Sequence, residues 1–164
     1  MKITPWFERV FTPINDNGLF LQILERLEGT PPRLSEKIKK IKVESEGSST
    51  TNWSSKKQIG HLIDVEPLWK ERILQIIKGE SQLLPADLTN RKTHETDHDA
   101  VDIKKLVREF KKLRSDLVVI LKNVKEVDLE KSAIHPRLNK PMRIIDLAYF
   151  VAEHDDHHLA QINS

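Results

Sequence analysis

The stretch IKKLVREFKKLRSDLVVILKNV, residues 103–124, has the most regular apolar spacing in the chain and decides the class of fold. Its apolar side chains recur every three or four residues, at Ile103, Leu106, Val107, Phe110, Leu113, Leu117, Ile120, Leu121 and Val124. Residues at this spacing share one face of an α-helix, and the polar residues between them cover the other face. The pattern predicts a long amphipathic helix, capped at its start by Asp99 or a neighbour.

Upstream, the same spacing predicts a helix over residues 16–28. The stretch Gly29-Thr30-Pro31-Pro32 is expected to stop it, because proline lacks the backbone N–H that a helix interior needs. A short amphipathic piece over residues 34–41 follows, so the two pieces form one broken helix. Residues 44–52 are predicted to be a polar loop.

The next periodic segment runs from Ser55 to Gly79. Ser55 and Gln58 have the spacing of a capping box, in which each side chain bonds the backbone N–H of the other residue. Pro67 lies inside this segment and is expected to kink the helix.

The last helix is predicted over residues 142–162, with Pro141 in its first turn, where a missing N–H costs nothing. Residues 80–99 and 128–140 form long polar connections between helices. Four long helices joined in part by long segments predict an all-α fold, a four-helix bundle with long crossover connections. No internal repeat interrupts the pattern, so residues 1–164 are expected to form a single domain.

The charges are balanced, with 27 basic and 25 acidic residues and a net charge of +2. No global field therefore attracts nucleic acid or an anionic membrane. The densest basic run, KIKKIK at residues 37–42, lacks aromatic neighbours on which bases could stack. We expect a small-molecule substrate rather than a nucleic-acid partner.

The chain has no cysteine, which excludes disulfides, thiolate metal ligands and a cysteine nucleophile. A metal ion would have to bind nitrogen or oxygen. No apolar run approaches the ~20 residues of a membrane span, and Glu8 and Arg9 interrupt the region where a signal peptide needs its apolar core. We therefore expect a soluble, cytoplasmic protein with no membrane partner.

Two histidines near the end of the chain, His154 and His158, continue the inward apolar stripe of the last helix. Residues four apart differ by about 40° around a helix, so both imidazoles can reach one ion. His61 lies near the apolar stripe of its own helix and can supply a third nitrogen. Three separately hydrogen-bonded core histidines are the alternative. The shared spacing favours a metal site slightly, because one ion would satisfy all three rings.

A second pair, His94 and His98, forms the sequence HETDH, which matches the zincin pattern and would make Glu95 a general base. The surrounding residues offer no apolar face on which such a helix could pack. Both are therefore expected to be solvated loop histidines.

Three stretches, WSSKKQIGHLIDVEPLW (53–69), LLPADLTN (83–90) and HPRLNKPMRIIDLAYFVAEHDDHHLAQI (135–162), resemble the DinB/YfiT-like family. The resemblance covers nearly the whole chain. It implies a four-helix bundle that holds a divalent metal ion, often zinc or nickel, with His61, His154 and His158 as ligands. His157 matches a paired histidine of the family and is a candidate contact for the substrate or for a ligand.

The family includes metal-dependent hydrolases and transferases that use a low-molecular-weight thiol. The resemblance therefore implies a thiol-dependent S-transferase or hydrolase, in which a metal-bound water or thiolate reacts and no side chain is assigned as catalytic. Trp69, Arg72 and Gln161 are further candidates for substrate contact, and the 87–90 loop is expected near the site. Family members are often dimers, so the resemblance also allows a homodimer. The alternative is a non-catalytic bundle with a structural or vestigial metal site that binds a partner.

Overall fold

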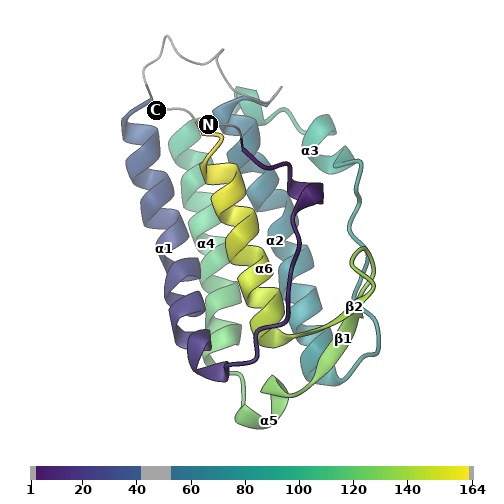
Figure 1. Cartoon of the computed structure of the whole chain (residues 1–164). Helices are drawn as coiled ribbons and strands as arrows, with labels where there is room; N and C mark the ends of the chain where they lie inside the picture. The colour runs from purple at the N-terminus through teal and green to yellow at the C-terminus, as the bar shows by residue number, and fades with distance from the viewer. Residues whose placement is uncertain (1–2, 42–52, 163–164) are drawn as a thin grey trace.

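The computed structural model describes residues 3–41 and 53–162, and four long helices dominate it (Figure 1). They are α1 (Phe20–Lys39), α2 (Ser55–Lys78), α4 (Ile103–Lys122) and α6 (Ile144–Leu159). Both α4 and α6 pack against α1 and α2, so the order around the bundle is α1, α4, α2, α6. The first two long helices, α1 and α2, therefore lie on one diagonal, and the last two, α4 and α6, lie on the other. The predicted all-α bundle with crossover connections is confirmed, while the 44–52 loop and Lys42 lie outside the described residues.

Short elements fill the connections and the N-terminal segment. They are η1 (Trp6–Glu8), η2 (Asn17–Leu19), α3 (Arg91–Glu95), η4 (His98–Ala100), α5 (Glu126–Leu129), β1 (Ser132–His135) and β2 (Lys140–Arg143). The two strands form an antiparallel hairpin, and the N-terminal segment runs beside α6 (Figure 1). The Ile14 N–H donates to Asp146 Oδ1 at 2.7 Å, which ties this segment to the first turn of α6.

The core consists of two clusters of buried apolar side chains. The larger includes Leu27, Trp69, Ile73, Leu117, Leu147 and Phe150, and the smaller includes Leu34, Ile59, Leu62 and Phe110. Each of the four long helices contributes to this core, as the periodic stripes predict. Within residues 3–41 and 53–162, no helix combines the length and apolar character needed to cross a membrane.

The predicted stop at Gly29-Thr30-Pro31-Pro32 is wrong, because α1 continues through it to Lys39. Proline at position 31 cannot donate to the Leu27 carbonyl four residues earlier. Arg114 on α4 supplies a donor instead, with its Nη1 lying 3.4 Å from the Leu27 oxygen. A neighbouring helix thus supplies a hydrogen bond that the sequence of α1 lacks.

The last helix starts later than predicted, at Ile144, because Pro141 and Met142 belong to β2. Pro141 faces Ile134 across the hairpin, and a proline is tolerated on an edge strand. Arg143 and Asp146 instead form the capping interaction of α6.

The starts of two other helices also differ in detail. The N-cap of α2 is Ser54, whose side chain accepts from the Lys57 N–H, rather than Ser55. The N-cap of α4 is Asp102, three residues after Asp99. Pro67 lies inside α2, which continues to its left-handed C-cap, Gly79.

Candidate metal site and cavity

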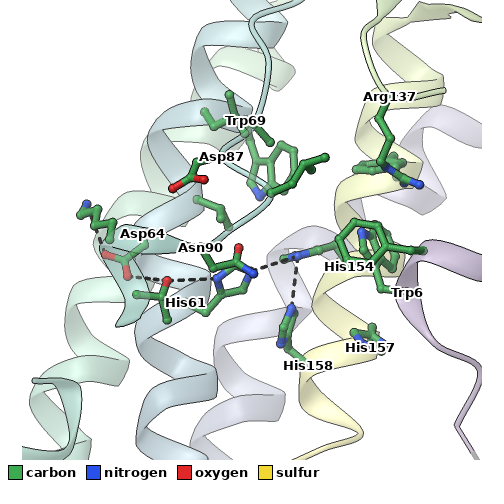
Figure 2. A pocket seen from close by; sticks show the side chains of 18 of the residues that line it. Trp6, His61, Asp64, Trp69, Asp87, Asn90, Arg137, His154, His157 and His158 are labelled. Carbon is green, nitrogen blue, oxygen red and sulfur yellow. Dashed lines mark hydrogen bonds and ion pairs between the residues drawn. The ribbon is translucent and has the colours of Figure 1, made fainter. Parts of the chain in front are cut away.

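Three imidazoles meet between α2 and α6 (Figure 2). His154 Nε2 lies 3.4 Å from His61 Nε2 and 3.2 Å from His158 Nε2. One ring nitrogen of each residue lies within 4.8 Å of the other two. We call these residues the histidine cluster. The structure thus brings together the three histidines that the sequence places on inward helix faces.

The His61 ring is oriented by a chain of hydrogen bonds. Thr93 Oγ1 lies 3.1 Å from His61 Nδ1 and donates its own hydrogen to Asp64 Oδ2 at 2.9 Å. The hydroxyl is therefore free to accept from Nδ1–H, which leaves the Nε2 lone pair directed at the histidine cluster. Asp64 also contacts Lys92 Nζ at 3.2 Å and His98 Nε2 at 2.9 Å, so its carboxylate is fully engaged.

His158 is oriented in the same way by a side-chain amide. Gln58 Oε1 lies 2.6 Å from His158 Nδ1, and Gln58 Nε2 donates to Gln161 Oε1 at 3.4 Å. Gln161 donates in turn to the His157 carbonyl at 3.1 Å. Because an amide oxygen can only accept, His158 carries its hydrogen on Nδ1 and presents the Nε2 lone pair to the cluster.

His154 lies between two indoles. Trp6 and Trp69 meet its ring edge-on, with centroid distances of 5.0 and 5.4 Å. Its Nδ1 is buried and has no hydrogen-bond partner among the described residues. Aromatic neighbours therefore hold this ring in place together with the contacts of its Nε2 to His61 and His158.

Burial keeps the three rings neutral. It lowers the pKa of His61 to about 4, and burial followed by the neighbouring imidazoles lowers the pKa values of His154 and His158 well below the ordinary value. Nitrogens bound to one ion at about 2.0–2.1 Å in tetrahedral geometry are about 3.3 Å apart. Two of the three distances in the cluster, 3.4 and 3.2 Å, are close to this value, and the third is within 4.8 Å, so the residues fit a divalent ion that prefers nitrogen ligands.

The histidine cluster opens onto a cavity of about 660 Å³. All four predicted contact candidates line it, namely Trp69, Arg72, His157 and Gln161, as do Asp87, Leu88 and Asn90 of the loop predicted to approach the site. Burial and then the Arg9 charge lower the pKa of His157 to about 4, and Arg9 Nη2 lies 3.4 Å from its Nδ1. The volume suits a ligand of small-molecule size.

The prediction that the HETDH histidines are solvated is correct for His94 and wrong for His98, and the predicted loop position of His94 is wrong, because this residue lies in α3. His94 is exposed, whereas His98 is 5% exposed and bonds Asp64. A Cβ on Gly60 would lie 2.2 Å from the His98 ring, so the glycine lets this ring pack directly on α2. Neither histidine belongs to the histidine cluster.

Several cavity residues escaped the sequence analysis. They are Trp6, Thr93, His135 and Arg137, which come from four different segments. Thr93 sits in a polar region without periodicity, and Trp6 precedes the first long helix. No local pattern relates such residues to a site assembled by long-range packing.

Residues 10–162 match the family model of the DinB superfamily. None of the curated proteins compared with the chain matches it. One similar structure is YfiT from Bacillus subtilis, described as a probable metal-dependent hydrolase with an unusual four-helix bundle topology. It is 16% identical, with a TM-score of 0.77, and the match covers 93% of this chain and 89% of that one.

A second similar structure is a mycothiol-dependent maleylpyruvate isomerase, 10% identical with a TM-score of 0.70. The match covers 99% of this chain but only 64% of the isomerase. At these identities the two structures establish a shared fold.

Proposed function

The chain belongs to the DinB superfamily, and from this premise we propose that it is a metal-dependent enzyme acting on small molecules. The ligands are His61, His154 and His158, and zinc or nickel is the metal. The reaction is hydrolysis or the transfer of a low-molecular-weight thiol. The observation that carries the proposal is the approach of three neutral imidazoles, whose Nε2 atoms lie at metal-ligand spacing beside a cavity.

Neutral imidazoles leave the charge of a divalent ion intact, so the ion would polarise a substrate and acidify a bound water or thiol. The chain's own residues prepare the site for this role. Thr93 and Gln58 hold the Nδ1 hydrogens of His61 and His158, which directs both Nε2 lone pairs inward. Trp6 and Trp69 cover the third ring and keep water from it.

A catalytic role rather than a structural one follows from the number of ligands. Structural zinc sites usually have four protein ligands, whereas catalytic sites have three and an open position. Asp155 is turned away toward Arg114, and Asp64 lies behind Thr93. Three nitrogens therefore converge, and a bound ion would have room for a further, non-protein ligand from the cavity.

The relatives support the two reaction classes. YfiT is described as a probable metal-dependent hydrolase, and the isomerase is mycothiol-dependent. A thiol cosubstrate and a hydrolytic reaction are both compatible with an acidified ligand next to a cavity of this size.

The test compares wild type with His158→Ala and with His94→Ala, an exposed histidine as matched control. Each is purified without a histidine tag, and metal content, helicity and thermal unfolding are measured with and without chelator. A panel of thiols with a halo-aromatic acceptor, and a panel of esters, report activity. We expect stoichiometric metal and activity in wild type and His94→Ala, and loss of both in His158→Ala with the helices retained.

Thr93→Val sharpens this test, because it removes the hydroxyl that orients His61 and leaves all three ligands in place. Loss of such a supporting hydrogen bond typically weakens metal binding about 10–100-fold. Failure of wild type to bind a divalent ion would refute the proposal. Unfolding on chelation would make the ion structural and favour the alternative, a non-catalytic binding module.

A further inference from the structure

Two arginines line the cavity at a distance from the histidine cluster. Arg72 lies on α2 and is 1% exposed, and Arg137 lies between β1 and β2 with its Nη2 buried. We call them the arginine pair. Arg72 Nε donates to the Leu84 carbonyl at 2.8 Å, and Arg137 Nη2 has no hydrogen-bond partner among the described residues. Within the same residues, no carboxylate forms an ion pair with either arginine.

His135 adds a further donor to this end of the cavity. The Leu138 N–H donates to His135 Nδ1 at 3.2 Å, and Arg72 Nη1 lies 3.1 Å from His135 Nε2. A neutral imidazole has a single acceptor nitrogen. Because His135 Nδ1 accepts from Leu138, His135 Nε2 carries the hydrogen. The Nε2–H of His135 and the Nη1–H of Arg72 are then two donors that face each other, and an acceptor atom of a ligand between them would satisfy both.

The carboxylates that line the cavity are already engaged and do not neutralise the arginine pair. Asp64 contacts Lys92, Thr93 and His98. Asp87 accepts hydrogen bonds within its own loop, from the backbone N–H groups at positions 89 and 91. A buried charge without a partner is costly, so this end of the cavity is suited to an anionic group brought by a ligand.

An aromatic wall connects the two ends of the cavity. The Arg137 guanidinium lies 5.9 Å from the Phe150 ring, and Phe150 contacts Trp6 and Trp69 at 5.0 and 5.8 Å. Both indoles contact His154. In Figure 2, Arg137 lies apart from His154 and His158, toward the upper end of the view. The cavity therefore runs from cations, along apolar rings, to neutral imidazoles.

We propose that Arg137 and Arg72 bind an oxyanion, a carboxylate or a phosphate, at one end of the substrate. The apolar body of that substrate lies along Trp6, Trp69 and Phe150, and its reacting group reaches the histidine cluster. The guanidinium fork matches either oxyanion with two parallel hydrogen bonds. The assignment of the reacting end rests on the proposed function, whereas oxyanion binding by the arginine pair requires no metal.

The test uses metal-free, chelated protein and three ligands that share an aromatic body: 3-phenylpropionate, 2-phenylethyl phosphate and the uncharged 3-phenylpropanamide. The three tryptophans of the chain, Trp6, Trp53 and Trp69, all line the cavity, so their fluorescence reports binding. We expect at least one oxyanion to bind about tenfold or more tightly than the amide, as charge-assisted hydrogen bonds allow. The oxyanion ligand that binds more tightly shows whether the arginine pair prefers a carboxylate or a phosphate.

Arg137→Ala should abolish the preference for the oxyanion, and Arg137→Lys should keep part of it. Arg108→Ala, at an exposed position of α4 outside the cavity, is the matched control and should leave the preference unchanged. Equal binding of the amide in wild type, or an unchanged preference in a folded Arg137→Ala, would overturn the proposal. So would a preference that appears only with metal, because the anion would then bind the ion. A failure of the proposed function can be distinguished from a failure of this proposal, because it would appear as the absence of metal binding and would leave the oxyanion preference of the metal-free protein unchanged.

Discussion

Arg114 and Arg72 are both 1% exposed, yet their surroundings differ completely. The Arg114 guanidinium donates to Glu66 Oε1 at 3.1 Å through Nε and to Asp155 Oδ1 at 2.9 Å through Nη2. Arg72 contacts a backbone carbonyl and an imidazole. One buried cation is therefore enclosed by carboxylates from two other helices, and the other has none.

The pKa values of the two guanidinium groups follow this difference. Burial lowers the pKa of Arg114, but Asp155 and Glu66 outweigh it and raise the pKa above its ordinary value. Burial and the nearby Arg137 charge lower the pKa of Arg72 to about 10. The buried cation enclosed by carboxylates joins three helices, whereas the one without a carboxylate partner lies at the cavity, where we propose that it binds an anionic ligand.

The largest effect is expected for Arg114→Met. The substitution leaves two buried carboxylates uncompensated and should lower the free energy of unfolding by about 3–5 kcal/mol, measured by urea denaturation. The exposed Arg108→Met on the same helix should change it by less than about 0.5 kcal/mol. Similar values for the two variants would show that Arg114 is not a structural cation.

Arg72→Met should cost much less, about 1 kcal/mol, because it breaks the hydrogen bond to the neutral Leu84 carbonyl without leaving a buried charge behind. The same urea titration measures it. A loss as large as that of Arg114→Met would remove the difference between the two sites and argue for a structural role at the cavity.

The pH dependence of stability tests the positive character of the cavity end. Burial, Arg72 and Arg137 lower the pKa of His135 from 6.5 to about 4. Below pH 6.5 the unfolded chain takes up a proton that folded His135 refuses until about pH 4, so the free energy of unfolding falls as the pH falls through this window. His135→Gln should show a smaller decrease than wild type. Identical profiles between pH 7 and 4 would contradict the shift.

The smallest effect on stability is expected for Arg137→Ala. The buried Nη2 of Arg137 has no hydrogen-bond partner among the described residues. Removal of the Arg137 side chain should therefore change the free energy of unfolding by less than about 0.5 kcal/mol. The same substitution should abolish the preference for an oxyanion over the amide. A loss of several kcal/mol in thermal or urea unfolding would place Arg137 with Arg114 as a structural residue.

Local pattern was sufficient to predict the helices and their inward faces. The spacing of Leu106, Phe110 and Leu117 reflects the period of the α-helix, which is a property of the backbone. The same period places His154 and His158 on one side of α6. The helical period and the position of the apolar face are properties of a single segment, so they can be predicted without knowing which other segments pack against it.

In other places the conformation depends on tertiary contacts, and local reasoning fails there. Pro31 stays inside α1 because Arg114 of another helix reaches the Leu27 carbonyl. Pro141 belongs to a strand because β1 of the same chain lies beside it, with Ile134 opposite the proline. The orientation of His61 by Thr93 and the proximity of Arg72 to His135 join residues 32 and 63 positions apart. Such contacts depend on how the helices pack, and no local periodicity encodes them. The sequence by itself therefore determined on which helix faces the three histidines lie. Packing determined the hydrogen-bond partners of their rings and left Arg72 and Arg137 without a carboxylate partner among the described residues.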